Sequence, residues 1–360
     1  MNRDNLLSLY DRLTKLVEKL PGGLQKPILR ELVPIRELFL EQRPARILLL
    51  GNSEQSVPDF LHSVAGVTVE IGESDNNWRL YRVRDRGEIL ILDARLDTPQ
   101  AVFSSALSRM VPDAALLLHQ PPHDEAAFEL AAARIATCPK ETPVIGVSFG
   151  GASERARFTA LSSAERQFSR RRLVVCAPEA GDSVAEAVSS ALPNVARLEF
   201  ARLTGAKEAQ AQIAGSLLKS FTAVCGVIGI QPIPLADMPV LTTLQTLMVG
   251  LIIYTTGKPV SARTIGEFLG ALGFNIGAGI VFRESARAII KIVPVWGNAV
   301  SGMVAGAGTY AIGRAAIAYF VEEIPINESK KLFHKLFPRW DAFKRRLPLP
   351  SRSEKNADKD

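Results

Sequence analysis

The stretch that decides the fold is RILLLGNSEQSVP, which runs from Arg46 to Pro58. Its apolar run predicts a buried strand, and Gly51 follows that run directly. A phosphate-binding loop begins in the same way and continues as G-x-x-x-x-G-K-[ST], because its lysine meets the phosphate charge and its hydroxyl holds magnesium. Counted from Gly51, the last three positions are instead Ser56, Val57 and Pro58. Valine has no charge and proline has no amide proton, so the segment predicts an architecture more firmly than an activity.

Apolar strands continue to alternate with helical patterns up to about residue 202. The expected strands are Ile47–Leu50, Val67–Ile71, Trp78–Val83, Glu88–Asp93, Ala114–His119, Pro143–Ser148 and Leu173–Ala177. Near-continuous apolar strands joined by helices predict an α/β fold with a doubly wound, mostly parallel sheet. Ligands of such sheets bind beyond the carboxyl ends of the strands, so a site is expected in the loops that follow them.

Composition divides the 360 residues into five expected parts. These are an N-terminal helical arm (1–44), the α/β domain (45–202), a linker helix (203–221), an apolar, glycine-rich all-α domain (222–325) and a basic aromatic tail (326–360). In the arm, Asn5–Leu20 and a second helix after Pro27, bent or broken near Pro34, are expected to pack on the neighbouring domain. The net charge of +6 suits an anionic partner without requiring one. Cys138, Cys176 and Cys225 lack metal-ligand spacing and indicate buried thiols of a reducing compartment.

Two intervals of the all-α region, Met238–Gly257 and Ile292–Gly313, contain no charged residue. Both approach the ~20 residues that a helix needs to span a bilayer. Small residues recur at helical spacing in the second interval and just beyond it, at Ala299, Gly302, Gly306, Thr309, Gly313 and Ala316. Such a face lets another backbone approach closely, as in membrane helix pairs. Membrane insertion or deep association is therefore favoured, and a soluble apolar bundle is the alternative.

The tail combines aromatic and basic residues. Between Lys330 and Arg346, seven lysines or arginines accompany one aspartate. Apolar side chains lie among them at helical spacing, at Phe333, Leu336, Phe337, Trp340 and Phe343. This pattern predicts an interfacial helix on anionic lipid, interrupted at Pro338, with a solvated charged face packed on the protein as the alternative. Nucleic-acid binding is not expected, because no recognisable module accompanies the basic residues.

The other sequence motifs of a guanine-nucleotide site are also incomplete. The strand Glu88–Asp93 ends in the aspartate that would orient magnesium, but the glycine of D-x-x-G is missing from Asp93-Ala94-Arg95-Leu96. Where a base-reading N-K-x-D is expected, the chain has Ser148-Phe149-Gly150-Gly151. Gly51 and Asp93 are thus the only vestigial site positions, and together they do not make a nucleotide site. We therefore expect no cofactor, no bound metal and no catalytic residue.

With these strands and decayed motifs, residues 45 to 200 resemble a degenerate bacterial Era-like small GTPase domain. The segments QPIPLADM (231–238), GFNIGAGIVFRESARAIIKIVPVWGNAVSG (273–302) and MVAGAGTYAIGRAAIAYF (303–320) are similar to the C-terminal domain that follows such domains in YcjF-type bacterial membrane-associated proteins. That domain has no established function. The resemblance implies a G-domain-like fold and a location at the cytoplasmic side of the bacterial inner membrane, with a cytoplasmic location as the alternative.

Two rival sites are visible. Gly146–Gly150, GVSFG, fits the nucleophile elbow of a serine hydrolase, but the only histidine downstream is His334, in the tail. His119 and His123 could form a metal pair with Asp124 or Glu125, although two intervening prolines favour a loop with two solvated histidines.

The resulting hypothesis is a non-enzymatic pseudo-GTPase scaffold or adaptor. Its partners would be anionic membrane lipid, an unidentified protein and, in a homo-oligomer, a second copy of the chain. The main alternative is a divergent GTPase that binds nucleotide through backbone amides and is completed by a partner or dimer mate. The missing lysine, hydroxyl and base-reading aspartate favour the scaffold.

Overall fold

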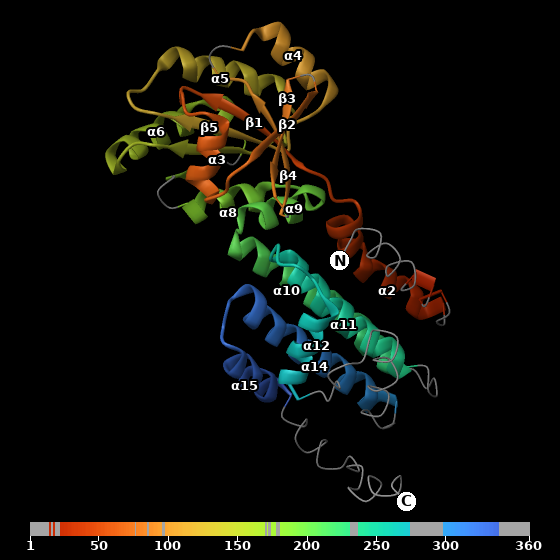
Figure 1. The fold of residues 1–360 in the computed structure, drawn as a ribbon. Helices are drawn as coiled ribbons and strands as arrows, with labels where there is room; N and C mark the ends of the chain where they lie inside the picture. The colour runs from red at the N-terminus through yellow and green to blue at the C-terminus, as the bar shows by residue number, and fades with distance from the viewer. Residues whose placement is uncertain are drawn as a thin grey trace, which may run out of the picture.

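The computed structural model describes residues 14–15, 17–18, 22–75, 77–84, 86–95, 98–169, 171, 174–177, 181–230, 237–273 and 298–337. Figure 1 shows a sheet flanked by helices at one end of the molecule and a body of packed helices at the other. This arrangement agrees with the predicted α/β domain followed by a helical region.

The sheet has seven strands in the order β2-β3-β4-β1-β5-β6-β7. They are β1 (Ala45–Gly51), β2 (Glu70–Asp75), β3 (Trp78–Val83), β4 (Gly87–Asp93), β5 (Ala114–His119), β6 (Val144–Ser148) and β7 (Val174–Cys176). Strands β4, β1, β5, β6 and β7 are parallel, whereas β2 and β3 run antiparallel to their neighbours. The sheet is therefore mixed but mostly parallel.

Helices cover both faces of the sheet. Alternate residues of the central strands point to opposite faces, and each face forms its own apolar core with the helices on that side. On one face, Ile47 and Leu49 pack with α3 (Val57–Ala65), α8 (Gly181–Ala191) and α9 (Asn194–Thr204). On the other, Leu48 and Leu50 pack with a second set of helices. That set comprises α4 (Gln100–Arg109), α5 (Glu125–Thr137), α6 (Ala152–Ala164) and α7 (Arg166–Ser169).

The helical body has one continuous apolar core. Its elements are α2 (Gly22–Ile35), η1 (Arg36–Leu40), α10 (Lys207–Ile230), α11 (Asp237–Thr255), α12 (Ala262–Ala271), α14 (Asn298–Ala316), η2 (Ile317–Val321) and α15 (Ile326–Leu336). The boundary expected at residue 222 falls inside α10, which is one continuous helix. The segment expected to be a linker helix is thus mainly the first part of a core helix.

The arm packs its apolar face as expected, but α2 lies on the helical body and not on the α/β domain that follows it in sequence. Ile28, Leu32 and Ile35 of α2 are almost completely buried in the helical core. However, the helix begins at Gly22 rather than after Pro27, because burial of its apolar face outweighs the backbone hydrogen bond that proline removes. The earlier expected helix, Asn5–Leu20, lies almost wholly outside the described residues.

The small residues of α14 face other helices of the body. A Cβ atom added at Gly306 would lie 3.6 Å from the Cα atom of Gly226 in α10, and one at Gly313 would lie 2.5 Å from Cδ1 of Leu218. The expected close approach of another helix is confirmed at these positions, and the approaching helix is α10. The surroundings of Ala299 and Gly302 are not described.

The described part of the tail corrects the expectation of a lipid-facing aromatic surface. Phe333 of α15 is completely buried in the helical core, and Leu336 and Phe337 pack against that core. Lys330, Lys331 and Lys335 are exposed. This part of the tail is a charged face packed on the protein by its apolar side chains, while Trp340 and Phe343 lie outside the described residues.

Two helical segments, Lys207–Gly229 and Val304–Val321, are long and apolar enough to cross a membrane by length and composition alone. This is weak support for insertion, because a core helix of a soluble protein passes the same test, and half or more of each segment is buried here. The expected interval Met238–Gly257 falls on α11, where Leu241–Thr255 is a shorter apolar helix.

Candidate functional site

The candidate site lies where the loops after β1, β4 and β5 meet at the carboxyl ends of three adjacent strands. Gly51 ends β1 with φ +108°, and a Cβ atom there would lie 2.0 Å from the carbonyl oxygen of Leu118. Asn52 donates its amide to the same carbonyl oxygen at 3.0 Å. Glycine is therefore required at position 51 by the close approach of β5.

The positions at which a phosphate-binding loop carries its last glycine, lysine and hydroxyl instead begin a helix here. Ser56 is the N-cap of α3, and its Oγ accepts a hydrogen bond from the amide of Asp59 at 3.2 Å. Val57 is buried in the sheet's apolar core, and Pro58 lies in the first turn, where a missing amide proton costs little. The sequence here satisfies helix initiation and packing.

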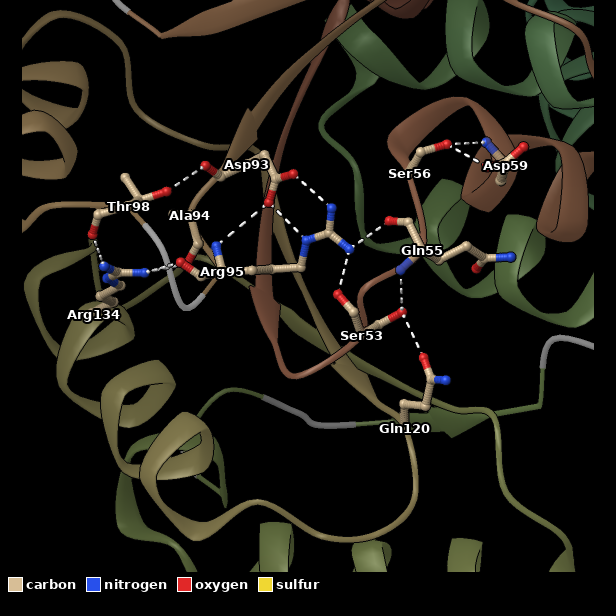
Figure 2. Close-up of polar contacts among 10 residues, drawn as sticks. All are labelled: Ser53, Gln55, Ser56, Asp59, Asp93, Ala94, Arg95, Thr98, Gln120 and Arg134. Atoms are coloured by element: carbon tan, nitrogen blue, oxygen red, sulfur yellow. Dashed lines mark hydrogen bonds and ion pairs between the residues drawn. The ribbon is translucent and has the colours of Figure 1, made fainter.

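The centre of the site is occupied by the guanidinium of Arg95 (Figure 2). Its Nε and Nη2 atoms donate to Oδ1 and Oδ2 of Asp93 at 2.8 and 2.6 Å. Its Nη1 atom donates to the carbonyl oxygens of Ser53 and Gln55 at 2.6 and 2.7 Å. One side chain therefore joins Asp93, at the end of β4, to the loop after β1. We call Ser53, Gln55, Asp93 and Arg95 the Arg95 cluster.

The polarity of the Arg95 cluster is opposite to that of a phosphate loop. A phosphate loop turns amide groups toward an anion, whereas here two loop carbonyl oxygens face a cation. Amides of the loop also have protein acceptors: Asn52 donates to Leu118, and the amide of Gln55 lies 3.4 Å from the Oγ atom of Ser53. The loop is thus filled from the side by Arg95, and not by Val57 and Pro58.

A second arginine, Arg134 of α5, holds the loop after β4 from the opposite side. Its guanidinium donates to the carbonyl oxygens of Ala94, Arg95 and Thr98 (Figure 2). It also lies 5.4 Å from the ring centroid of Phe103. Arg134 is only 2 % exposed, and this burial lowers the pKa of its guanidinium. The described residues Ala94, Arg95 and Thr98 after β4 are therefore tied to α5 by hydrogen bonds.

The loop after β5 is attached to the loop after β1 by Asn52. The side chain of Asn52 donates to the carbonyl oxygen of Gln120 at 2.6 Å and accepts from the Gln120 amide at 2.8 Å. The Oγ atom of Ser53 also lies 3.3 Å from Oε1 of Gln120. Of the residues brought together here, Gly51 and Asp93 were predicted from the sequence, whereas Asn52, Arg95 and Arg134 were not. The only local signal was an arginine two positions after a strand-ending aspartate.

The geometry does not fit a serine hydrolase at Ser148. Strand pairing places His119 beside Ser148, with 3.3 Å between Nδ1 and Oγ, a contact that a search for downstream histidines missed. However, Ser148 is completely buried at the end of β6, and no substrate carbonyl can reach its hydroxyl. A nucleophile elbow requires an exposed serine on a strained turn. Among the described residues other than glycine, positive φ angles occur at Asn77 and Glu323.

The expectation of two solvated histidines is wrong for His119. This side chain is 4 % exposed and stacks on Phe158 with 4.4 Å between ring centroids, and burial lowers its pKa. His123 packs edge-on against Phe128. No group of three or more metal-ligating side chains occurs in the described part of the chain.

The three cysteines are buried, and none forms a disulfide, as predicted. Burial raises the pKa of Cys138 to about 11 and that of Cys225 to about 12. At neutral pH both side chains are therefore protonated thiols, which are poor nucleophiles and poor metal ligands.

Comparison of the sequence with models of known protein families and with curated proteins finds no match. The function must therefore be argued from the Arg95 cluster and from the surfaces of the helical body.

Proposed function

We propose that the chain is a non-catalytic, GTPase-like scaffold whose α/β domain keeps its form without a nucleotide. The observation that carries this proposal is the position of the Arg95 guanidinium, which bridges Asp93 to the carbonyl oxygens of Ser53 and Gln55. A nucleotide-bound magnesium ion would have to compete with this guanidinium for Asp93. A phosphate group would meet carbonyl oxygens at Ser53 and Gln55, where it needs hydrogen-bond donors.

A second support is the fixed state of the surrounding loops. GTPase switching depends on segments that become ordered around the γ-phosphate and are released after hydrolysis. Here Arg95 and Arg134 hold the loop after β4 from both sides. The domain therefore offers partners one constant surface and has no use for a nucleotide-dependent change.

The test is calorimetric titration of the full chain with GTP and GDP in the presence of Mg²⁺. We expect no binding by the wild type, and none by Arg95→Ala, because that variant still lacks the lysine and the hydroxyl. Micromolar binding by the wild type would sink the proposal. Binding by Arg95→Ala alone would instead identify Arg95 as an inhibitory plug in a divergent GTPase.

We further propose that the scaffold associates with anionic membranes at their surface and does not insert α10 into the bilayer. The outward side of α10 is polar over its first part, with Gln212, Ser216 and Lys219 exposed at helical spacing, whereas Ala223 is exposed further along. Lys219 lies near the middle of the apolar segment Lys207–Gly229, so insertion would place a charge near the bilayer centre at a cost of about 3 kcal/mol. The exposed Lys330, Lys331 and Lys335 of α15 provide the cationic surface.

Membrane fractionation with a carbonate wash tests this second proposal. We expect the protein to sediment with membranes at low salt and to be released by carbonate. The variant Lys330→Glu/Lys331→Glu/Lys335→Glu should lose sedimentation with vesicles that contain one quarter phosphatidylglycerol, while Lys140→Glu, in the α5–β6 loop of the α/β domain, should retain it. Protein that resists carbonate and is extracted only by detergent would contradict surface association.

A further inference from the structure

The Arg95 cluster also has a ligand preference, and the inference drawn from it rests on the proposed absence of nucleotide binding. Four oxygen atoms surround the guanidinium: both carboxylate oxygens of Asp93 and the carbonyl oxygens of Ser53 and Gln55. At neutral pH a carboxylate and two carbonyl groups accept hydrogen bonds and donate none. The cluster is therefore complementary to a cation.

The arrangement of these acceptors suits a planar guanidinium in particular. Asp93 receives two parallel hydrogen bonds, from Nε and Nη2 of Arg95, which is the bidentate geometry of an arginine–carboxylate pair. The remaining terminal nitrogen uses its two hydrogens on the carbonyl oxygens of Ser53 and Gln55. An ammonium ion lacks this flat fork, and Mg²⁺ requires a near-octahedral shell at about 2.1 Å.

The Arg95 cluster is partly open to solvent, and protein contacts hold its backbone in place. The Arg95 side chain is 15 % exposed and that of Asp93 is 39 % exposed, so a small ion can enter from water. Arg134 binds the carbonyl oxygens of Ala94, Arg95 and Thr98, and these contacts do not involve the Arg95 side chain. The backbone of the loop after β4 is therefore held even when the Arg95 side chain is shortened.

We propose that the Arg95 cluster is a guanidinium-binding site whose resident ligand is the chain's own Arg95. This side chain orders the loops after β1 and β4, a task that a bound nucleotide and its metal perform in nucleotide-binding domains. When the side chain is removed, the site accepts a free guanidinium compound in its place and rejects phosphate.

The experiment measures thermal unfolding of full-length Arg95→Ala with added methylguanidinium. At about ten times its Kd, a ligand that binds only the folded state should raise the midpoint by roughly 2 °C. The wild type should not respond, because its site is full, and neither should Arg95→Ala/Asp93→Asn, which has lost the carboxylate. Arg82→Ala is the matched control, since it breaks an exposed arginine–glutamate pair with Glu88 in the same sheet.

Equal concentrations of trimethylammonium, MgCl₂ and phosphate serve as competing probes. No response of Arg95→Ala to methylguanidinium, or a larger response to Mg²⁺ or phosphate, would overturn the inference. GTP binding by the wild type would sink the proposed function and leave these melting curves unchanged, so the two failures are distinguishable.

A second variant covers the case in which Arg95→Ala does not fold. Arg95→Lys keeps the charge but loses the planar fork, so it cannot fill all four acceptors. Hydrogen exchange at residues 52–56 should become at least tenfold faster in this variant, while exchange in the helical body stays at the wild-type rate. Wild-type protection of residues 52–56 in Arg95→Lys would show that the fork is not needed and would also overturn the inference.

Discussion

At the scale of single residues, the partly buried Arg95 and the buried Arg134 both form hydrogen bonds at the end of β4 or just after it. Arg95 forms its ion pair with Asp93, whereas Nη1 and Nη2 of Arg134 donate to carbonyl oxygens and its buried Nε atom has no hydrogen-bond partner in the described part of the chain. Carbonyl oxygens thus satisfy the terminal nitrogens of the buried guanidinium. The two side chains therefore hold the segment after β4 by different contacts. Arg95 pairs with the carboxylate of Asp93, and Arg134 binds backbone carbonyl oxygens.

The variant Arg134→Met measures the contribution of the backbone contacts. Methionine fills similar volume but leaves the carbonyl oxygens of Ala94, Arg95 and Thr98 without their donor, so we expect a loss of about 2–4 kcal/mol in the free energy of unfolding. Urea denaturation followed by circular dichroism provides the measurement. Arg157→Met, at an exposed position of α6, is the control and should cost about 0.5 kcal/mol or less. Equal losses in the two variants would contradict a special role for Arg134.

At the scale of elements, the central strands were predictable because burial on both faces makes them continuously apolar. The expected strand Ala114–His119 coincides with β5. The strand expected at Val67–Ile71 begins only at Glu70, because β2 is an exposed edge strand whose extent follows its pairing with β3, and Val67 packs into the core below. Runs of apolar residues predict buried strands, but they do not predict the bounds of a strand that is exposed to solvent.

The candidate site was less predictable than the strands, because its contacts are between segments distant in sequence. Arg95 reaches carbonyl groups 42 and 40 positions earlier in the chain. His119 meets Ser148 only because β5 and β6 are neighbours in the sheet. The polar residues Gln212, Ser216 and Lys219 of α10, by contrast, recur at a helical period that is visible in the sequence. This period argues against membrane insertion of the helix.

At the scale of the whole molecule, the sheet domain and the helical body are joined by both polar and apolar contacts. Glu186 of α8 accepts hydrogen bonds from the amides of Glu208 and Ala209, at 2.7 and 2.8 Å, and so caps the start of α10. The guanidinium of Arg202 in α9 lies 3.8 Å from the ring centroid of Tyr254 in α11. Residues of α8 and α9 also enter the helical core, namely Ala185, Leu198 and Ala201.

These contacts predict that the two bodies unfold together. Differential scanning calorimetry of the wild type should give one transition, because the helical core continues into α8 and α9. In Glu186→Ala/Tyr254→Ala, the cap of α10 and the arginine stacking are lost while the apolar contacts of α8 and α9 remain, so the endotherm should broaden and move to lower temperature. Tyr310→Ala, at a tyrosine that is 43 % exposed on α14, is the control and should keep a single transition.

Two transitions in the wild type would mean that the sheet domain and the helical body are energetically independent. For the proposed scaffold, two transitions would put the partner surface on a sheet domain that unfolds independently of α15, whereas a single transition would show that the two bodies are energetically coupled.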